Sequence, residues 1–261
     1  MPTYALLGAT GSTGSAILRC FLSQPPKSLA LNIFVRSEPK LRKLFPDLES
    51  TTAFKTNIIE GIPSDSTAIR ECLENVDVVM ACIGSNESKR GMSLSYDTAT
   101  AIIDALKSNR ETRGSAYKPP TIIQLRSASL NPILSAAMPW IARKMAGFCF
   151  HYIYEDLDRA CKLFASSAAD SPGLLDYIFI DPPSIHDADG TMPTGYKLIL
   201  DEKQEGALSY ADLGAAFCEV AERREEFAGK GVGVTATGTV NLTWGTLQGY
   251  MATGAKSRIW G

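Results

Sequence analysis

Three glycines between an apolar run and an amphipathic segment constrain the fold more than any other feature of the chain. The segment YALLGATGSTGSAILRCFL, residues 4–22, has the spacing Gly8-x-x-Gly11-x-x-Gly14. A strand that enters such a loop and a helix that leaves it form the context of a dinucleotide-binding fingerprint. Gly8 permits the tight turn, Gly11 lets the backbone approach a pyrophosphate, and Gly14 allows close packing of helix against strand.

The residues between the glycines supply donors for phosphate oxygens. The first turn of the helix offers unpaired N–H groups and the positive end of the helix dipole. A glycine-rich turn without a ligand is the alternative, but the position directly after a strand favours a dinucleotide. The predicted diphosphate contacts are Gly8, Thr10, Gly11, Ser12, Thr13 and Gly14.

Strand and helix patterns alternate along the first half of the chain. The run VDVVMACIG, residues 76–84, is continuously apolar, as a central parallel strand buried on both faces should be. The alternation predicts an α/β fold with a doubly wound, Rossmann-like parallel sheet and right-handed crossovers. We expect the polar stretch 110–120 to be an exposed insertion. Strand-like runs lie at 4–9, 29–36, 54–61, 76–84 and 121–127.

The second half continues without a break in composition, so we expect a single NAD(P)-binding domain over residues 1–261. Residues 182–210 and 225–261, approximately, are expected to form a small C-terminal lobe on the substrate side. The expected elements are a long helical region over 139–167, strands at 174–181, 196–200 and 229–238, and a capped helix over 209–223.

Charge and composition exclude several classes of partner. The 26 basic and 28 acidic residues leave no basic excess, so no nucleic acid is expected. No apolar run approaches the ~18 residues of a membrane span, so no membrane partner is expected. The start of the chain carries no secretion signal, which predicts a cytoplasmic protein. With two histidines and no CxxC pair, no metal site is expected, and nothing indicates an oligomeric state.

The end of the second strand indicates which dinucleotide is bound. The segment NIFVRSEPKLRK places Arg36 directly after the apolar run, with Lys40 close behind. An acidic residue there would hold the ribose 2′-OH of NAD, whereas a guanidinium suits the 2′-phosphate of NADP. A solvated basic helix start is the alternative. We therefore predict NADP(H), bound in part by Arg36 and Lys40.

These motifs together resemble the atypical short-chain dehydrogenase/reductases, the NmrA-like group of NAD(P)-binding Rossmann proteins. The resemblance extends to VDVVMACIG, TIIQLRSAS, LLDYIFIDPPSI and SYADLGAAF. It implies a small-molecule substrate, a cofactor ribose beside Ile83 and Gly84, and a nicotinamide beside Ser127 and Pro183. More loosely, FHYIYEDLDRACKLF with GYKLIL is similar to averufin-oxidase-like proteins of fungal polyketide pathways, which implies secondary metabolism.

The chain departs from the family pattern where catalysis is expected. Carbonyl reductases of the family often carry Tyr-x-x-x-Lys, but Tyr152 is followed four residues later by Asp156, and Tyr154 by Asp158. An adenine-binding Asp after the third strand is replaced by Ile62, with Asp65 or the backbone as substitutes. Asp181 stands where the family often has Arg.

The candidate catalytic residues are therefore a serine and a short aromatic cluster. Ser127 at the end of the fifth strand is placed to bond a substrate carbonyl, with Ser129 as the alternative and strand-end capping as the structural explanation. Tyr152, Tyr154 and His151 are candidate proton donors, because residues three apart share a helix face. Ordinary aromatic packing explains the two tyrosines equally well.

Two further segments suggest a substrate pocket. The aromatic and methionine-rich stretch 139–154 forms either a pocket wall or an ordinary apolar helix face. The loop IHDADGTMPTG, residues 185–195, is long enough to act as a lid.

Three functions follow from these features. The first is an NADPH-dependent oxidoreductase acting on a small hydrophobic or aromatic carbonyl or quinone. The second is an NADP-binding, redox-sensing regulator without turnover, which the missing Tyr-x-x-x-Lys pair favours. The third is an isomerase, epimerase or dehydratase on the same scaffold.

Overall fold

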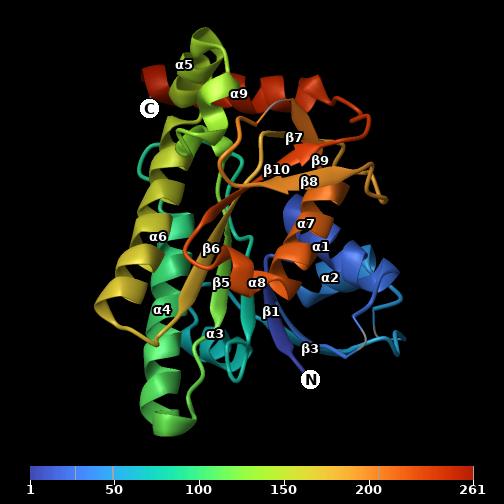
Figure 1. Ribbon diagram of the computed structural model, residues 1–261, viewed down its shortest axis with the longest axis vertical. Coiled ribbons are helices and arrows are strands. Elements are labelled where there is room, and N and C mark those ends of the chain that lie inside the picture. The colour runs from blue at the N-terminus through green and yellow to red at the C-terminus, as the bar shows by residue number, and fades with distance from the viewer. Residues whose placement is uncertain (27, 49, 205, 261) are drawn as a thin grey trace.

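A computed structural model describes residues 1–26, 28–48, 50–204 and 206–260. Its main sheet is built from β1 (Thr3–Leu7), β2 (Ala30–Val35), β3 (Lys55–Glu60), β4 (Val78–Ala81), β5 (Thr121–Leu125), β6 (Asp176–Asp181), β8 (Tyr196–Ile199) and β10 (Gly231–Ala236). The strand order is β3-β2-β1-β4-β5-β6-β10-β8 (Figure 1). Every pairing is parallel except that of β10 with β8. The doubly wound, Rossmann-like sheet is confirmed.

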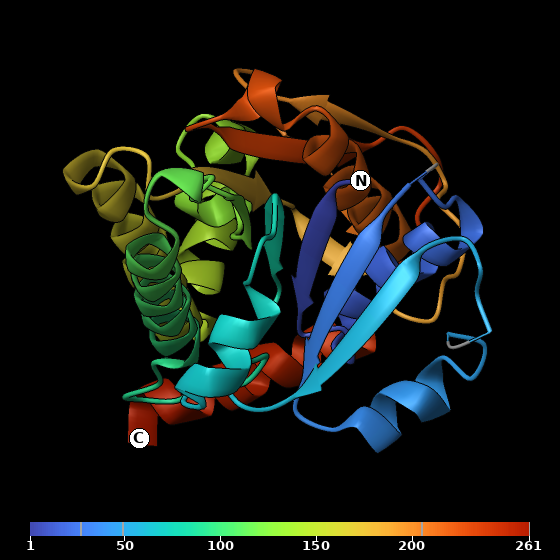
Figure 2. The same ribbon diagram turned by 90° about the horizontal axis from the view of Figure 1, so that it is seen from below.

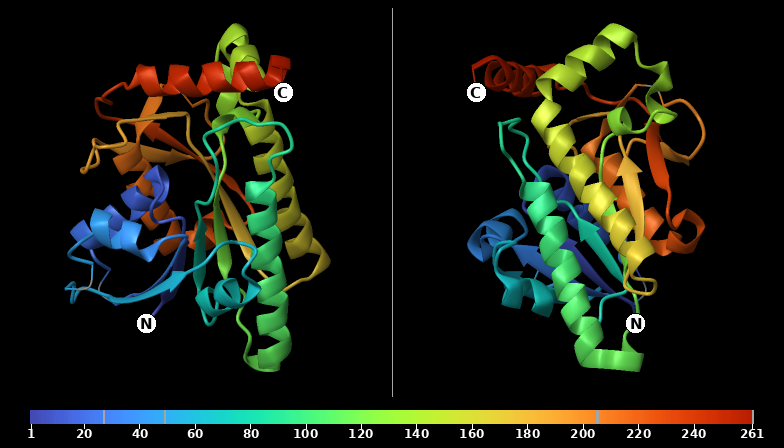
Figure 3. Two further views of the ribbon diagram at one scale, coloured as in Figure 1. Left: turned by 180° about the vertical axis from the view of Figure 1, so that it is seen from behind. Right: turned by 90° about the vertical axis from the view of Figure 1, so that its left-hand side faces the viewer.

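Helices cover both faces of this sheet (Figures 2 and 3). They are α1 (Ser12–Ser23), α2 (Glu38–Leu44), α3 (Ser66–Cys72), α4 (Leu94–Arg113), α5 (Trp140–Cys149), α6 (His151–Asp170), α7 (Tyr210–Glu222), α8 (Arg224–Phe227) and α9 (Trp244–Trp260). Helices α1 and α7 pack together over one face, and α3, α4 and α6 over the other. Adjacent residues of β1 enter opposite cores, Leu6 with Phe217 and Leu7 with Phe164, which explains its unbroken apolar sequence.

The prediction of an exposed insertion at 110–120 is wrong for residues 110–113, which are helical. Helix α4 continues to Arg113, because no proline or glycine interrupts it before Gly114. Gly114 has φ of +53° and ends the helix in a conformation that side chains disfavour. The helical region predicted over 139–167 is also divided, since Phe150 leaves helical geometry and separates α5 from α6.

The C-terminal part contains elements that the sequence pattern did not reveal. Strands β7 (Ser184–His186) and β9 (Ala207–Ser209) form a separate two-stranded sheet. Helix α9 contains Gly245, Gly249 and Gly254, which lower helix propensity and hide it from a pattern search. It runs across one end of the molecule beside α5 (Figures 1 and 3). Among the described helices, none is both long and apolar enough to span a bilayer.

Candidate active site

The glycine loop has the geometry that its spacing predicts. Gly8 has φ of +92°, and its N–H donates to the Phe34 carbonyl at 3.1 Å. A Cβ on Gly8 would lie 3.0 Å from the Cys82 carbonyl carbon, and one on Gly14 only 2.2 Å from the Gly8 oxygen. Gly8 and Gly14 are therefore required by the turn and by the packing of α1 against it.

Gly11 has a different reason to be glycine. A Cβ there would meet a single atom within 4 Å, the Gly8 oxygen at 3.4 Å, and a Cβ on Gly84 would meet only Ser95 Oγ at 4.0 Å. Both backbones thus border open space at the carboxyl ends of β1 and β4. Gly11 is also the N-cap of α1 and offers no side chain to its first N–H groups. These residues fit the diphosphate of a nicotinamide dinucleotide.

The hydroxyl groups of the loop face different surroundings. Thr10 and Ser12 are half-buried, whereas Thr13 is buried. Ser12 is hydrogen-bonded to Tyr210, the first residue of α7, whose phenol pKa is raised by burial. Tyr250 of α9 lies near Tyr210, and its phenol oxygen accepts a hydrogen bond from Asn86 Nδ2 at 3.3 Å. Helices α7 and α9 therefore approach the cofactor edge of the sheet, which no sequence motif indicated.

The basic residues after β2 are exposed at the same edge. Arg36 follows the last residue of the strand, and Lys40 lies in the first turns of α2. Glu38, the acid nearest in sequence, forms an ion pair with Arg42. Among the described residues no acid pairs with Arg36, and its side chain is exposed.

Ile83, Gly84 and Pro183 lie at the carboxyl ends of the central strands. Ile83 and Gly84 follow β4, and Pro183 follows β6. The Ala128 N–H donates to the Pro182 carbonyl at 3.0 Å, which joins the segments leaving β5 and β6. The three residues predicted from the family resemblance thus lie on the edge that carries the glycine loop.

Tyr154 and Ser129 meet beyond the end of β5. The Tyr154 phenol donates to Ser129 Oγ at 3.2 Å, and the Tyr154 ring lies 5.9 Å from that of Phe150. Ser127 Oγ instead accepts the Ser129 N–H at 3.3 Å and caps the short helical turn Ala128–Leu130. The structure therefore pairs the alternative serine, Ser129, with a tyrosine and gives Ser127 a capping contact.

Tyr152 and His151 point to other neighbours. The Tyr152 phenol accepts from Arg90 Nε at 3.4 Å, and Arg258 lies 5.5 Å from the centre of its ring. Hydrogen bonds from Arg90, and then from Arg258, lower the pKa of Tyr152. The His151 ring lies against Tyr152, and its Nε2 is 3.8 Å from Glu155. The structure thus separates the contacts of His151 from those of Tyr154.

The two aspartates that replace a catalytic lysine have defined structural contacts. The buried carboxylate of Asp156 accepts the Ser95 N–H at 2.8 Å and the Tyr96 N–H at 3.0 Å, which caps α4. Asp158 is partly exposed and pairs with Lys162 at 2.6 Å, one turn further along α6. Neither tyrosine therefore has the lysine ammonium of a Tyr-x-x-x-Lys pair four residues further along the helix.

Asp181 has an arginine partner from the neighbouring strand. Arg126 Nε donates to Asp181 Oδ1 at 2.6 Å, and Asn131 Nδ2 donates to Oδ2 at 3.1 Å. Asp181 is fully buried, and the Arg126 guanidinium lies 4.8 Å from the centre of the Phe179 ring. A Cβ on Gly231 would approach Arg126 Nη2 to 2.5 Å, so the pair needs a glycine there. The buried ion pair joins the ends of β5 and β6.

The loop over residues 185–195 is held at both ends. The buried Asp212 carboxylate accepts the N–H groups of Thr194 and Gly195 at 2.8 and 2.9 Å. At the other end His186 Nδ1 accepts the Thr243 N–H at 3.1 Å. Burial lowers the pKa of His186, which suits a neutral ring that accepts this bond. Met192, between these anchors, is exposed.

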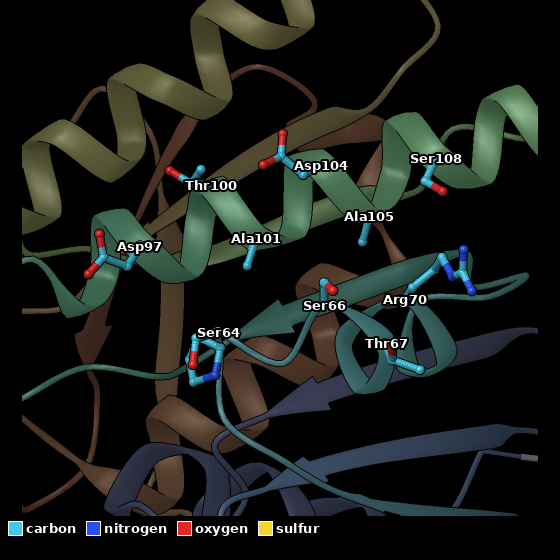
Figure 4. A pocket seen from close by; sticks show the side chains of 11 residues that line it. Ser64, Ser66, Thr67, Arg70, Asp97, Thr100, Ala101, Asp104, Ala105 and Ser108 are labelled. Atoms are coloured by element: carbon cyan, nitrogen blue, oxygen red, sulfur yellow. The ribbon is translucent and has the colours of Figure 1, made fainter.

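Asp65 caps a helix, and a surface groove lies between two helices. Asp65 accepts the N–H groups of Thr67 and Ala68 and caps α3, while Ile62 is exposed. A groove of about 540 Å³ runs between α3 and α4 and is lined by Ser and Thr side chains with Arg70, Asp97 and Asp104 (Figure 4). None of the predicted catalytic or cofactor residues lines it. Within the described residues, no three His, Cys, Asp or Glu side chains gather as metal ligands do.

Comparison with known proteins decides the family. The family model described as NAD(P)H-binding matches residues 8–224, from the first glycine of the loop to the start of α8. The chain belongs to this family. Averufin oxidase A of Dothistroma septosporum is 52% identical over 263 residues, which cover 99% of this chain and 92% of that protein. Averufin oxidase A of Aspergillus flavus is 48% identical, with 99% and 91% covered.

A more distant relative and a solved structure extend the comparison. A protein named oxidoreductase dmxR7, from a Cryptosporiopsis species, is 32% identical over 90% of this chain and 94% of its own. A short-chain dehydrogenase/reductase of Veillonella parvula, solved in complex with NADP, has the same fold, with a TM-score of 0.63 and 16% identity over 91% and 96% of the two chains. The expected oxidoreductase class and the resemblance to averufin oxidases are confirmed.

Proposed function

We propose that this protein is an NADPH-dependent oxidoreductase that acts on a small hydrophobic or aromatic carbonyl or quinone in polyketide secondary metabolism. The observation that carries the proposal is the 3.2 Å hydrogen bond between Tyr154 and Ser129. It lies on the same edge of the sheet as the glycine loop, where open α/β sheets bind their ligands. The relatives named averufin oxidase support the pathway and the redox class.

In this reaction the protein has to position the substrate and supply a proton to its oxygen. When bound, the nicotinamide dinucleotide supplies hydride transfer. Reduction of a carbonyl adds a hydride at carbon and a proton at oxygen. In this proposal Ser129 bonds the substrate oxygen, and the Tyr154 phenol gives its proton to that oxygen and is reprotonated from solvent. Oxidation of an alcohol runs through the same contacts in reverse.

The cofactor form and the substrate side follow from neighbouring residues. Arg36 and Lys40 are exposed beside the expected 2′-phosphate, and guanidinium groups bind phosphates through paired charge-assisted bonds. Residues 182–210 and 225–261, which include the anchored loop and α9, are proposed as the substrate-side lobe of a single domain. Ser127 and Pro183 would then line the nicotinamide side. The enzyme is proposed to work in the cytoplasm.

A redox-sensing regulator without turnover is the second candidate. One observation favours it. At the two positions where a catalytic lysine was expected, Asp156 caps α4 and Asp158 pairs with Lys162. Such a protein would bind NADP(H) tightly and leave every substrate unchanged. An isomerase or dehydratase would convert substrate with no net change in cofactor.

One experiment separates these functions. The protein is mixed with NADPH and a panel of quinones and aromatic ketones, and the loss of the reduced-nicotinamide absorbance band is followed. The proposal expects turnover that falls roughly 10²–10⁴-fold in Tyr154→Phe, with a similar direction in Ser129→Ala and cofactor affinity unchanged. Tyr96→Phe is the matched control, because the ring of Tyr96, on α4, packs against Arg159 of α6. Undiminished turnover in Tyr154→Phe would remove Tyr154 from the mechanism.

A further inference from the structure

Helix α5 exposes apolar side chains that neither core nor cofactor edge uses. Eight of its ten residues are exposed. The stretch 139–154 was expected to form either a pocket wall or an ordinary apolar helix face, and α5, its first part, projects at one end of the molecule (Figure 1). Its exposed large apolar residues are Trp140, Ile141, Met145 and Phe148.

The C-terminal end of α9 carries two further exposed apolar side chains. Ile259 is 60% and Trp260 77% exposed, and α9 packs directly against α5. Gly254 makes this packing close, because a Cβ there would lie 1.9 Å from the Cys149 carbonyl oxygen. We call the six exposed residues of the two helices the α5–α9 patch. Soluble monomers rarely leave such side chains grouped in water without a function.

Every charged residue in the two segments that carry the patch is a cation. Residues 127–154 and 239–261 contain no Asp or Glu, although the whole chain has 28 acidic residues against 26 basic ones. Arg143 and Lys144 lie on α5, and Lys256 and Arg258 on the end of α9. The Lys144 ammonium lies 5.2 Å from the centre of the Trp140 ring. A lysine whose stem follows an aromatic ring is typical of side chains at a polar–apolar boundary.

The charges beside the α5–α9 patch favour a lipid bilayer over a second copy of the chain as its partner. In a two-fold dimer through this patch, the same cations would meet each other and repel. The nearby acids are already paired, Glu155 beside His151 and Glu87 with Lys89. Exposed tryptophan, phenylalanine and isoleucine beside lysine and arginine match a helix lying in the headgroup region of a bilayer. Such a contact needs no membrane-spanning segment, which was the basis for expecting no membrane partner.

We propose that the α5–α9 patch docks the protein peripherally on an anionic lipid bilayer. Apolar side chains of α5 and the end of α9 enter the interface, and Arg143, Lys144 and Lys256 contact lipid phosphates and carboxylates. This inference does not depend on the proposed reaction, because it rests on the exposed residues alone.

The chain contains its own probe for the test. Its three tryptophans, Trp140, Trp244 and Trp260, all lie on α5 or α9. Full-length protein is mixed with phosphatidylcholine vesicles, with or without phosphatidylserine, and tryptophan emission and co-sedimentation are measured. The expected result is a blue shift and sedimentation with anionic vesicles only, both reversed by high salt.

Matched variants locate the contact. Phe148→Ser with Met145→Ser should abolish sedimentation, whereas Leu44→Ser with Ile62→Ser, at exposed positions elsewhere, should not. Arg143→Glu with Lys144→Glu should weaken partition at least tenfold, since each cation near an anionic surface changes it about fivefold, and Lys55→Glu should not. Thermal unfolding of each variant verifies that it is folded.

Two results would overturn the proposal. One is no sedimentation with either vesicle at low salt. The other is a stable dimer or a complex with another protein, measured by light scattering, that Phe148→Ser with Met145→Ser disrupts while vesicle binding is absent.

Discussion

The two halves of the candidate active site are built by different means. The glycine-loop half depends on backbone geometry, in which Gly8 and Gly14 are required by contacts of 3.0 and 2.2 Å and Gly11 borders open space. The half around Tyr154 depends on side chains, namely the Tyr154–Ser129 hydrogen bond and a buried Arg126–Asp181 pair. The backbone geometry of the loop is determined by a short local motif, whereas the side-chain contacts form between residues far apart in the sequence. The first half can therefore be recognised from a local motif, whereas the second half becomes visible only in the folded chain.

The largest expected effect tests the side-chain half. Arg126→Ala leaves the fully buried Asp181 without its cation and should reduce the free energy of unfolding by about 3–5 kcal/mol. Denaturant unfolding measures it. Lys162→Ala, which removes an exposed partner of Asp158, is the control and should change it far less. A loss below about 1 kcal/mol for Arg126→Ala would mean that the pair is not what holds β5 to β6.

The next effect tests the backbone half. Gly14→Ala forces a Cβ against the Gly8 oxygen and should reduce the free energy of unfolding by about 1–3 kcal/mol while weakening dinucleotide binding. Gly147→Ala on α5, where a Cβ meets nothing within 4 Å, should be neutral or stabilising by up to about 1 kcal/mol. Unfolding and calorimetric titration with NADPH measure both. Equal behaviour of the two variants would contradict the packing role of Gly14.

A smaller effect concerns selectivity between cofactors. Arg36→Asp should weaken NADPH binding by roughly 1.5–3 kcal/mol, because a charge-assisted bond to the 2′-phosphate is lost, and should affect NADH much less. Arg113→Asp at the end of α4 is the matched control. Titration with each dinucleotide gives the ratio of affinities. A parallel loss for both dinucleotides would mean that Arg36 does not read the 2′-phosphate.

The smallest effect is a pH dependence of stability from His186. Its pKa is lowered in the folded state by burial, so the unfolded chain binds the proton first as pH falls below about 6.5. Stability should therefore be complete above that pH and decline below it. Melting temperatures across this range should lose part of that slope in His186→Gln but not in His151→Gln. An unchanged slope in His186→Gln would assign the acid sensitivity to other groups.

Local signals account for what the sequence predicted. The glycine spacing, the apolar run of β4 and the cap of α7 by Ser209 each depend on residues close together in the chain. The alternation of these signals was enough to give the doubly wound sheet and the family. Arg36 was predicted as a cofactor contact for the same reason, since it directly follows a strand.

The remaining features depend on contacts between distant residues. Ser129 and Tyr154 lie 25 positions apart, and Arg126 and Asp181 lie 55 apart. Which serine meets the tyrosine depends on the turn Ala128–Leu130, which no local pattern distinguishes from an ordinary strand end. Helix α9 was missed because its three glycines oppose helix formation, and packing on α5 compensates for them.

The contacts of Asp156 and Asp158 bear on how a lysine could return to this site. A lysine at 156 would place an ammonium against two backbone N–H donors in a fully enclosed position and would remove the cap of α4. A lysine at 158 would stand in a partly exposed position and would lose only the pair with Lys162. One amino-acid substitution could therefore create a tolerated Tyr-x-x-x-Lys pair with Tyr154 but not with Tyr152. Tyr154 is also the tyrosine that already forms a hydrogen bond to a serine.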